Sequence, residues 1–260
     1  MQKWLYLIPL LTLLSPELQA ETPADKGLAI AIEANKRDNG WVDQTSDMEM
    51  ILRNKQGEES HRTLHISSLE VNDDGDKSLT IFDDPKDVKG TALLSYTHAL
   101  VPDDQWLYLP ALKRVKRISS SNKSGPFVGS EFAYEDLTSQ EVEKYSYTWL
   151  RDEPLDGKNC FVIERTPAYE NSGYTRQIVW IDQEIYHPLK VEYYDRKNAL
   201  LKTLSMNDYK QYLDKYWRPH RMHMINHQTG KETSLIWKNY QFGNGLTDRD
   251  FDQNTLKRAR

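Results

Sequence analysis

The sequence is poor in cysteine, with Cys160 as its single example among 260 residues. A disulfide within the chain is therefore excluded, even in an oxidising compartment. Cys160 begins the apolar run Cys-Phe-Val-Ile, where a small buried core residue is expected. A catalytic cysteine is the alternative, but no histidine lies in the same predicted strand and no nucleophile signature surrounds it.

An excess of positive charge is also missing. Lys and Arg number 34 against 39 Asp and Glu, which gives a formal net charge of −5. Nucleic-acid-binding domains carry basic surfaces, so this modest acidic balance argues against nucleic acid as a partner.

The common signatures of enzymes and metal sites are absent as well. The sequence contains no glycine-rich phosphate loop, no G-x-S-x-G elbow and no H-E-x-x-H. His220, His223 and His227 lie in a Trp- and Met-rich segment, where the first two would converge on a metal only in a helix. The neighbouring Arg218-Pro219 favours an extended chain instead. We expect no catalytic residues, no metal and no cofactor.

Only one hydrophobic run stands out, and it is too short to span a membrane. Met1–Ala20 has Lys3 in a short charged region, an apolar core at Trp4–Leu14 and the small-residue cleavage site Leu18–Ala20. This pattern is typical of a secretory signal peptide, removed before Glu21. The residue directly after the cleavage site is Glu21 and not the cysteine that would take a lipid anchor. We therefore expect a soluble protein of residues 21–260 in the periplasm.

The remaining chain is mostly β in pattern. Residues 22–39 predict one helix, with Thr22 or Asp25 as N-cap and an apolar face of Leu28, Ala31 and Ile32. From Asp43 onward the period changes to two, and turn signals such as Asp156-Gly157 separate about a dozen strand-like segments. No linker or change in composition divides them. The pattern predicts one domain at 21–260, built on a single antiparallel sheet.

The segment Trp106–Leu137 combines several of these signals. Trp106–Leu109 and Lys113–Ile118 predict a hairpin interrupted by Pro110, and a polar loop follows. Ser130 is then an expected N-cap for a helix with acids near its start.

Three blocks here resemble the outer membrane lipoprotein-sorting protein family, periplasmic relatives of LolA and LolB. They are DPKDVKGTALL at Asp84–Leu94, DQWLYLPALKRVKRI at Asp104–Ile118 and GPFVGSEFAYEDL at Gly125–Leu137. The resemblance implies a curved antiparallel sheet, a half-open barrel with covering helices, around a hydrophobic cavity that holds acyl chains. It also implies an inner-membrane RND-type exporter as partner.

Apolar positions with period two are candidates for the lining of such a cavity, and methionine suits it because its flexible thioether fits variable chains. Ordinary core packing is the alternative for each of them. The nine candidates are Met48, Met50, Leu52, Leu64, Ile66, Leu79, Ile81, Trp106 and Tyr108.

The cations of the predicted hairpin are candidates for a partner surface or a lipid head group, and a solvated strand face is the alternative. They are Lys113, Arg114, Lys116 and Arg117. Because side chains alternate along a strand, Arg114 and Lys116 project to one side and Lys113 and Arg117 to the other. We expect one pair to turn inward and meet carboxylates such as Glu131, Glu135 or Asp136, or the cargo head group.

These expectations combine into a non-enzymatic periplasmic carrier of lipid or lipoprotein acyl chains, which shuttles between inner and outer membrane as a monomer with transient membrane contact. The first alternative is an interaction module of an exporter complex that carries no lipid. A secreted hydrolase is the second.

Overall fold

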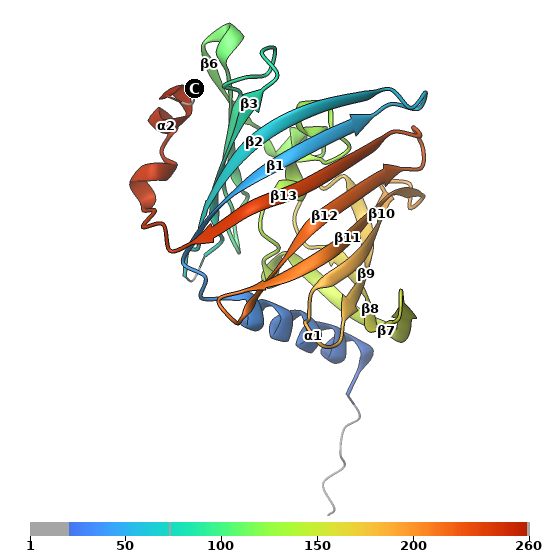
Figure 1. Ribbon diagram of the computed structural model, residues 1–260. Helices are drawn as coiled ribbons and strands as arrows, with labels where there is room; N and C mark the ends of the chain where they lie inside the picture. The colour runs from blue at the N-terminus through green and yellow to red at the C-terminus, as the bar shows by residue number, and fades with distance from the viewer. Residues whose placement is uncertain (1–20, 73, 259–260) are drawn as a thin grey trace, which may run out of the picture.

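The computed structural model describes residues 21–72 and 74–258, in which thirteen antiparallel strands form one sheet (Figure 1). The order across the sheet is β6-β5-β4-β3-β2-β1-β13-β12-β11-β10-β9-β8-β7. The strands are β1 Asp43–Arg53, β2 Glu59–Leu69, β3 Lys77–Asp84, β4 Ala92–Tyr96, β5 Asp104–Leu109, β6 Arg114–Ile118, β7 Tyr145–Leu155, β8 Lys158–Pro167, β9 Tyr174–Asp182, β10 Pro188–Asp195, β11 Leu200–Tyr212, β12 Tyr216–Asn226 and β13 Glu232–Phe242.

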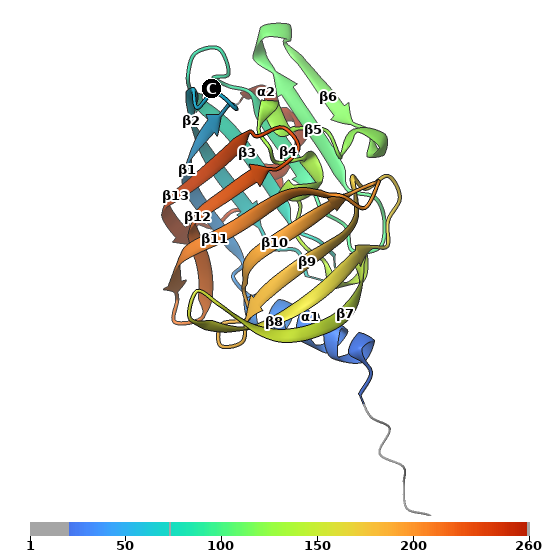
Figure 2. The same cartoon turned by 90° about the vertical axis from the view of Figure 1, so that its right-hand side faces the viewer.

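The chain order explains this arrangement. Strands β1 to β6 run outward as a meander, residues 119–144 cross to the far edge, and β7 to β13 return until β13 pairs with β1. Strands β6 and β7 remain as the two free edges, so the sheet curves strongly without closing (Figures 1 and 2). The expected mostly β fold, a single curved antiparallel sheet in a half-open barrel, is confirmed.

Residues 119–144, called the crossover below, contain only single 3₁₀ turns. These are η2 Ser120–Asn122, η3 Phe127–Gly129, η4 Tyr134–Leu137 and η5 Val142–Lys144. The helix expected from Ser130 is therefore wrong. The Ser130 hydroxyl accepts from the Phe132 N–H two residues on, and Phe127 and Phe132 join through a backbone hydrogen bond of 2.7 Å. This tight loop buries both rings, which a helix starting at Ser130 would separate.

Helix α1, Pro23–Asp38, lies across the lower end of the sheet (Figure 1). Thr22 is its N-cap and forms a capping box with Asp25, as the sequence allows. The buried face is Gly27, Ile30 and Ala31. Of the expected face, Ala31 is confirmed, whereas Leu28 and Ile32 are wrong, being 41% and 50% exposed. A Cβ at Gly27 would lie 2.7 Å from the Trp149 nitrogen, so only glycine allows the helix to approach β7 this closely.

The sheet has two differently covered faces. The concave face holds the main hydrophobic core, with α1 and the crossover packed onto it. The outer face of β3, β4 and β5 is covered by the C-terminal segment, which contains the 3₁₀ turn η6, Asp248–Phe251, and helix α2, Gln253–Arg258 (Figure 1). Phe251 and Leu256 are fully buried there against Leu94.

Candidate functional site

The concave face carries methionines on three strands, β1, β12 and β11, with β13 between β1 and β12. Met48 and Met50 lie on β1, Met222 and Met224 on β12 and Met206 on β11, and all belong to or pack against the main core. Cross-strand pairing places them on one line, because Met50 opposes Leu235 of β13, Leu235 opposes Met222, and Met222 opposes Met206. Residues directly opposite in a sheet share a face. These five residues, called the methionine row below, form one continuous apolar surface of flexible side chains.

The crossover covers this surface with aromatic side chains. Phe127 and Phe132 are 1% and 2% exposed. Phe127 packs at 5.6 Å between ring centroids on Phe82 of β3 and at 5.8 Å on Tyr134 of the crossover itself. The chain's own aromatic residues thus occupy the space in front of the sheet.

Hydrogen bonds from several strands hold the crossover in place. Arg62 of β2 donates to the Val128 carbonyl at 2.6 Å, and Gln105 of β5 donates to the Tyr134 carbonyl at 3.0 Å. On the other side of the sheet, Asn226 of β12 donates to the Glu131 carboxylate at 2.6 Å. The crossover is therefore tied to both halves of the sheet.

A buried ion pair is part of this anchoring. Lys202 Nζ of β11 lies 2.6 Å from the Asp136 carboxylate, and both side chains are 4% exposed. Asp136 also accepts from the Tyr174 hydroxyl at 2.8 Å and the Ala133 N–H at 2.7 Å, while Lys202 also donates to the Glu131 carbonyl at 2.9 Å. Such a pair is tolerable in the interior because its remaining polar atoms are also satisfied.

The neighbouring Glu135 is buried without a direct cation. It accepts from Ser172 Oγ and the Gly173 N–H, each at 2.8 Å, and from the Tyr169 hydroxyl at 3.2 Å. Burial raises the pKa of Glu135, and the adjacent Asp136 charge raises it further. These contacts tie η4 to the loop between β8 and β9.

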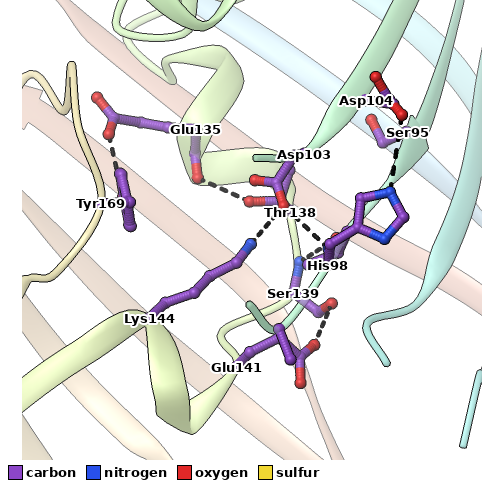
Figure 3. A network of polar contacts seen from close by, with 12 residues as sticks. Ser95, His98, Asp103, Asp104, Glu135, Thr138, Ser139, Glu141, Lys144 and Tyr169 are labelled. Atoms are coloured by element: carbon purple, nitrogen blue, oxygen red, sulfur yellow. Dashed lines mark hydrogen bonds and ion pairs between the residues drawn. The ribbon is translucent and has the colours of Figure 1, made fainter. Parts of the chain in front are cut away.

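The last part of the crossover is fixed by a second polar network (Figure 3). Lys144 Nζ lies 2.5 Å from the Asp103 carboxylate, with the two side chains 7% and 15% exposed. Ser139 Oγ donates to Glu141 at 2.7 Å and accepts from the Asp76 N–H at 3.3 Å. Burial and the nearby Glu141 carboxylate raise the pKa of Asp76 to about 7.

Four cavities border the crossover. The largest of them, of about 570 Å³, separates the crossover from β9 to β12, and its lining includes Glu131, Asp195, Arg196 and Lys202. A second, of about 310 Å³, lies against the turns of β1–β2 and β12–β13. A third, of about 470 Å³, lies against the β5–β6 hairpin. A fourth cavity of about 320 Å³ adjoins the network of Figure 3.

The nine apolar candidates do not lie together. Those on the concave face are Met48, Met50, Leu52, Leu64 and Ile66. Those on the outer face, packed in the cluster under the C-terminal segment, are Leu79, Ile81, Trp106 and Tyr108. One cavity cannot be lined by both groups, so the expectation of a single lining set is corrected. The C-terminal segment gives the outer group an apolar partner of its own.

The four cations of the hairpin are all exposed. Arg114 and Lys116 pair across the strands with Leu109 and Leu107, which places them on the concave side as alternation predicts. Neither they nor Lys113 form an ion pair with a residue in the described part of the chain, and Arg117 pairs with Asp104 on the opposite face.

The expected contact of an inward pair of these cations with crossover carboxylates is therefore wrong. Glu131, Glu135 and Asp136 instead bind groups of β11, β12 and the β8–β9 loop.

Neither the histidines nor the cysteine assemble a reactive site. Within residues 21–72 and 74–258, no group of three or more His, Cys, Asp or Glu side chains is arranged to hold a metal ion. His220 and His223 lie on the extended strand β12, as their sequence context predicts. Cys160 is fully buried on β8, in agreement with a core role, and burial raises the pKa of its thiol. No helix in the described ranges is long and apolar enough to cross a membrane.

The candidates chosen from the sequence did not include Met206, Met222 and Met224, or Lys202, whose buried ion pair holds the crossover. The three methionines had a detectable signal, since Met222 and Met224 alternate in the same manner as Met48 and Met50. Lys202 had none, because its partner Asp136 is 66 residues away along the chain.

Comparison with known proteins agrees with this fold. A family model described only as an uncharacterized protein matches residues 74–258. An outer membrane lipoprotein-sorting protein domain from Vibrio parahaemolyticus is 61% identical, with a TM-score of 0.89, over 90% of this chain and 99% of that one. A DUF1329 family protein from Desulfovibrio piger is 30% identical, with a TM-score of 0.85, over 90% of this chain and 99% of that one.

A LolA superfamily protein from Nitrosomonas europaea shares the fold at 20% identity and a TM-score of 0.71, over 88% of this chain and 98% of that one. No curated protein matches the chain.

Proposed function

This chain belongs to the outer membrane lipoprotein-sorting protein family, and from that premise we propose that it is a periplasmic, non-enzymatic carrier of lipid or lipoprotein acyl chains. It shuttles its cargo between inner and outer membrane, touches membranes only transiently, and has an inner-membrane RND-type exporter as its partner. Residues 21–260 act as one monomeric domain after residues 1–20, which lie outside the described residues, are removed as a signal peptide.

The observation that carries the proposal is the methionine row on the concave face. All five methionines of the described residues are in it. Thioether side chains adapt to ligands of different shape, and a curved sheet with one apolar face offers room for a chain once the crossover moves. Each buried CH₂ of an acyl chain contributes about 0.8 kcal/mol, so non-covalent contacts suffice for tight binding.

An unpaired donor beside this row also supports the proposal. Trp237 Nε1 is buried and is the one buried side-chain polar atom of the described residues without a hydrogen-bond partner. Trp237 opposes Met48 across β13 and β1. A buried donor without a partner is unfavourable, and the carbonyl of an acyl ester is a suitable acceptor for it.

The test has two parts. Native mass spectrometry of protein purified from its own envelope should detect co-purified lipid. A photoreactive fatty acid should then label peptides that contain Met48, Met50 or Met224 on the concave face. The internal control is the outer face, where peptides with Trp106 and Tyr108 should stay unlabelled. Absence of both lipid and labelling, or labelling of the outer face alone, would refute the carrier proposal.

The second candidate is an exporter-binding module without lipid, and the exposed hairpin at a free sheet edge favours it. Arg114 and Lys116 lack ion-pair partners in the described part of the chain, so their charges remain available to an acidic surface. This candidate predicts no co-purified lipid together with an exporter complex that weakens when Arg114 is replaced by Glu.

A further inference from the structure

The cavity at the β5–β6 hairpin, called the hairpin groove below, combines an apolar floor with a free cation. Its volume is about 470 Å³, within the roughly 300–1,000 Å³ typical of small-molecule sites. Leu107 and Ile118 form its floor and are 7% and 8% exposed. The opposite wall is the crossover, with Ser121, Asn122, Ser124, Gly125, Pro126 and Tyr134.

Lys116 is the one charged residue of this lining. It is exposed and forms no ion pair with any residue of the described ranges, whereas Arg117, its neighbour on the opposite face, is paired with Asp104. Arg114 lies two residues before Lys116 on the same side of the strand, because it opposes Leu109 just as Lys116 opposes Leu107. The groove therefore presents positive charge with no carboxylate among its walls.

The floor of the groove is continuous with the main core. Leu107 and Ile118 belong to the same cluster as Met48 and Met50, and Leu109 and Tyr134 pack against it. An acyl chain whose head lies at Lys116 would thus meet apolar side chains leading toward the methionine row.

The larger cavity on the other side of the crossover has a different chemistry. Its cations are accompanied by the carboxylates Glu131 and Asp195. Lys202 is neutralised by Asp136, and Arg196 donates to the carbonyls of Ser172 and Asn171. Its charges are thus partly committed within the protein, which favours the hairpin groove as the anion-binding side.

We propose that the hairpin groove binds the anionic head of an acyl amphiphile, a carboxylate or phosphate held at Lys116, with the first part of its chain on Leu107, Leu109 and Ile118. This inference rests on the proposed carrier function and adds the charge class of the cargo and its place of binding. A free inorganic anion shares the head-group chemistry, so the test separates the two sources.

The experiment compares three probes on the full chain: a fluorescent fatty acid, its methyl ester and inorganic phosphate as competitor. Lys116→Glu should weaken binding of the fatty acid about tenfold, since one charge-assisted contact is lost and a repulsion is added. Binding of the ester should be unchanged, and Lys116→Arg should stay within about twofold of wild type. The control is Lys210→Glu, an exposed strand lysine that lines none of the four cavities.

A fluorophore at the groove gives an independent readout. Cys160 is fully buried, so a polarity-sensitive maleimide should label only the new thiol of Lys116→Cys. Addition of the fatty acid should shift its emission, and the same label at Lys210→Cys should not respond.

Equal binding of the fatty acid by wild type and Lys116→Glu would overturn the groove assignment and leave the carrier proposal standing. Complete displacement of the fatty acid from Lys116 by inorganic phosphate would mean a free-anion site and would also overturn the assignment. Equal affinity of the wild type for the acid and its methyl ester would mean that the groove does not recognise the charge, which would overturn it as well. Binding of neither acid nor ester by wild type would remove the carrier proposal together with this inference.

Discussion

Replacing Lys202 by Met should loosen the crossover without unfolding the sheet. The substitution keeps a long apolar stem and leaves the Asp136 carboxylate buried without its cation. Breaking one partner of a buried pair costs about 3–5 kcal/mol. The lower end applies here, about 3 kcal/mol, because Asp136 keeps its hydrogen bonds from Tyr174 and Ala133.

The loss should fall on the crossover first, since Lys202 joins β11 to Asp136 of the crossover and the sheet ladder itself is unchanged. Hydrogen exchange of residues 124–137 should therefore accelerate by about a hundredfold, with much smaller changes in β2 and β12. If the crossover competes with cargo, the apparent affinity for a fluorescent fatty acid should rise, because a larger fraction of the protein is competent to bind.

The matched control is Lys158→Met, which breaks another Lys–Asp pair with a separation of 2.6 Å, between Lys158 and Asp182 at the far side of the sheet. It should alter neither exchange in the crossover nor fatty-acid affinity. Adding Asp136→Asn to Lys202→Met should restore part of the stability, because no uncompensated charge remains. Exchange that accelerates equally in sheet and crossover, or a fall in affinity of the folded variant, would refute this reasoning.

Two further substitutions test the packing around the site. Asp76→Asn should abolish a pH dependence of the free energy of unfolding. The pKa of Asp76 is about 7 in the folded protein, above its ordinary value of 3.8. The buried charge therefore lowers the stability of the wild type progressively between pH 4 and 7, and by a constant amount above pH 7. Urea unfolding at pH 5 and 8 should show this as a gain for the variant at pH 8 of at most about 4 kcal/mol, and equal gains at both values would contradict it. Gly27→Ala should lower the melting temperature by roughly 2–10 °C, because a Cβ would meet the Trp149 backbone. A higher melting temperature, as helix propensity alone predicts, would show that α1 does not pack this closely.

The local alternation of apolar residues predicted the strands correctly, but for some strands it did not predict which side chains lie on the concave face. Period two located Met48, Met50, Leu64 and Ile66 on one side, and the sheet keeps them there. Leu79 lies on the other side, although its strand β3 pairs with β2.

Two features explain the failure. In the register of β2 and β3, Leu79 and Ile81 oppose Ser67 and His65, which alternate with the inward-facing Leu64 and Ile66, and a register one residue different would reverse this assignment. The outer face of β3 is also covered by Phe251 from the chain's end, a partner that no local pattern could reveal.

The partners of the buried acids of the crossover could not be predicted from the sequence for a similar reason. The residues Glu131, Glu135 and Asp136 follow four cations closely along the chain, which made the hairpin their nearest expected partner. The fold instead turns them toward strands that come later in the sequence, so distance along the chain gave the wrong pairing.

The position of the crossover follows from the topology itself. Because β1 and β13 pair in the middle of the sheet, β6 and β7 become opposite edges, and the segment that joins them must span the opening of the curve. Its aromatic side chains then fill the face that carries the methionine row. If the protein is the proposed carrier, an acyl chain on that face would have to displace Phe127 and its neighbours, and the affinity for cargo would be the difference between two sets of apolar contacts. Such a difference is smaller than the full set of contacts with the cargo, and a carrier must release its cargo as well as bind it.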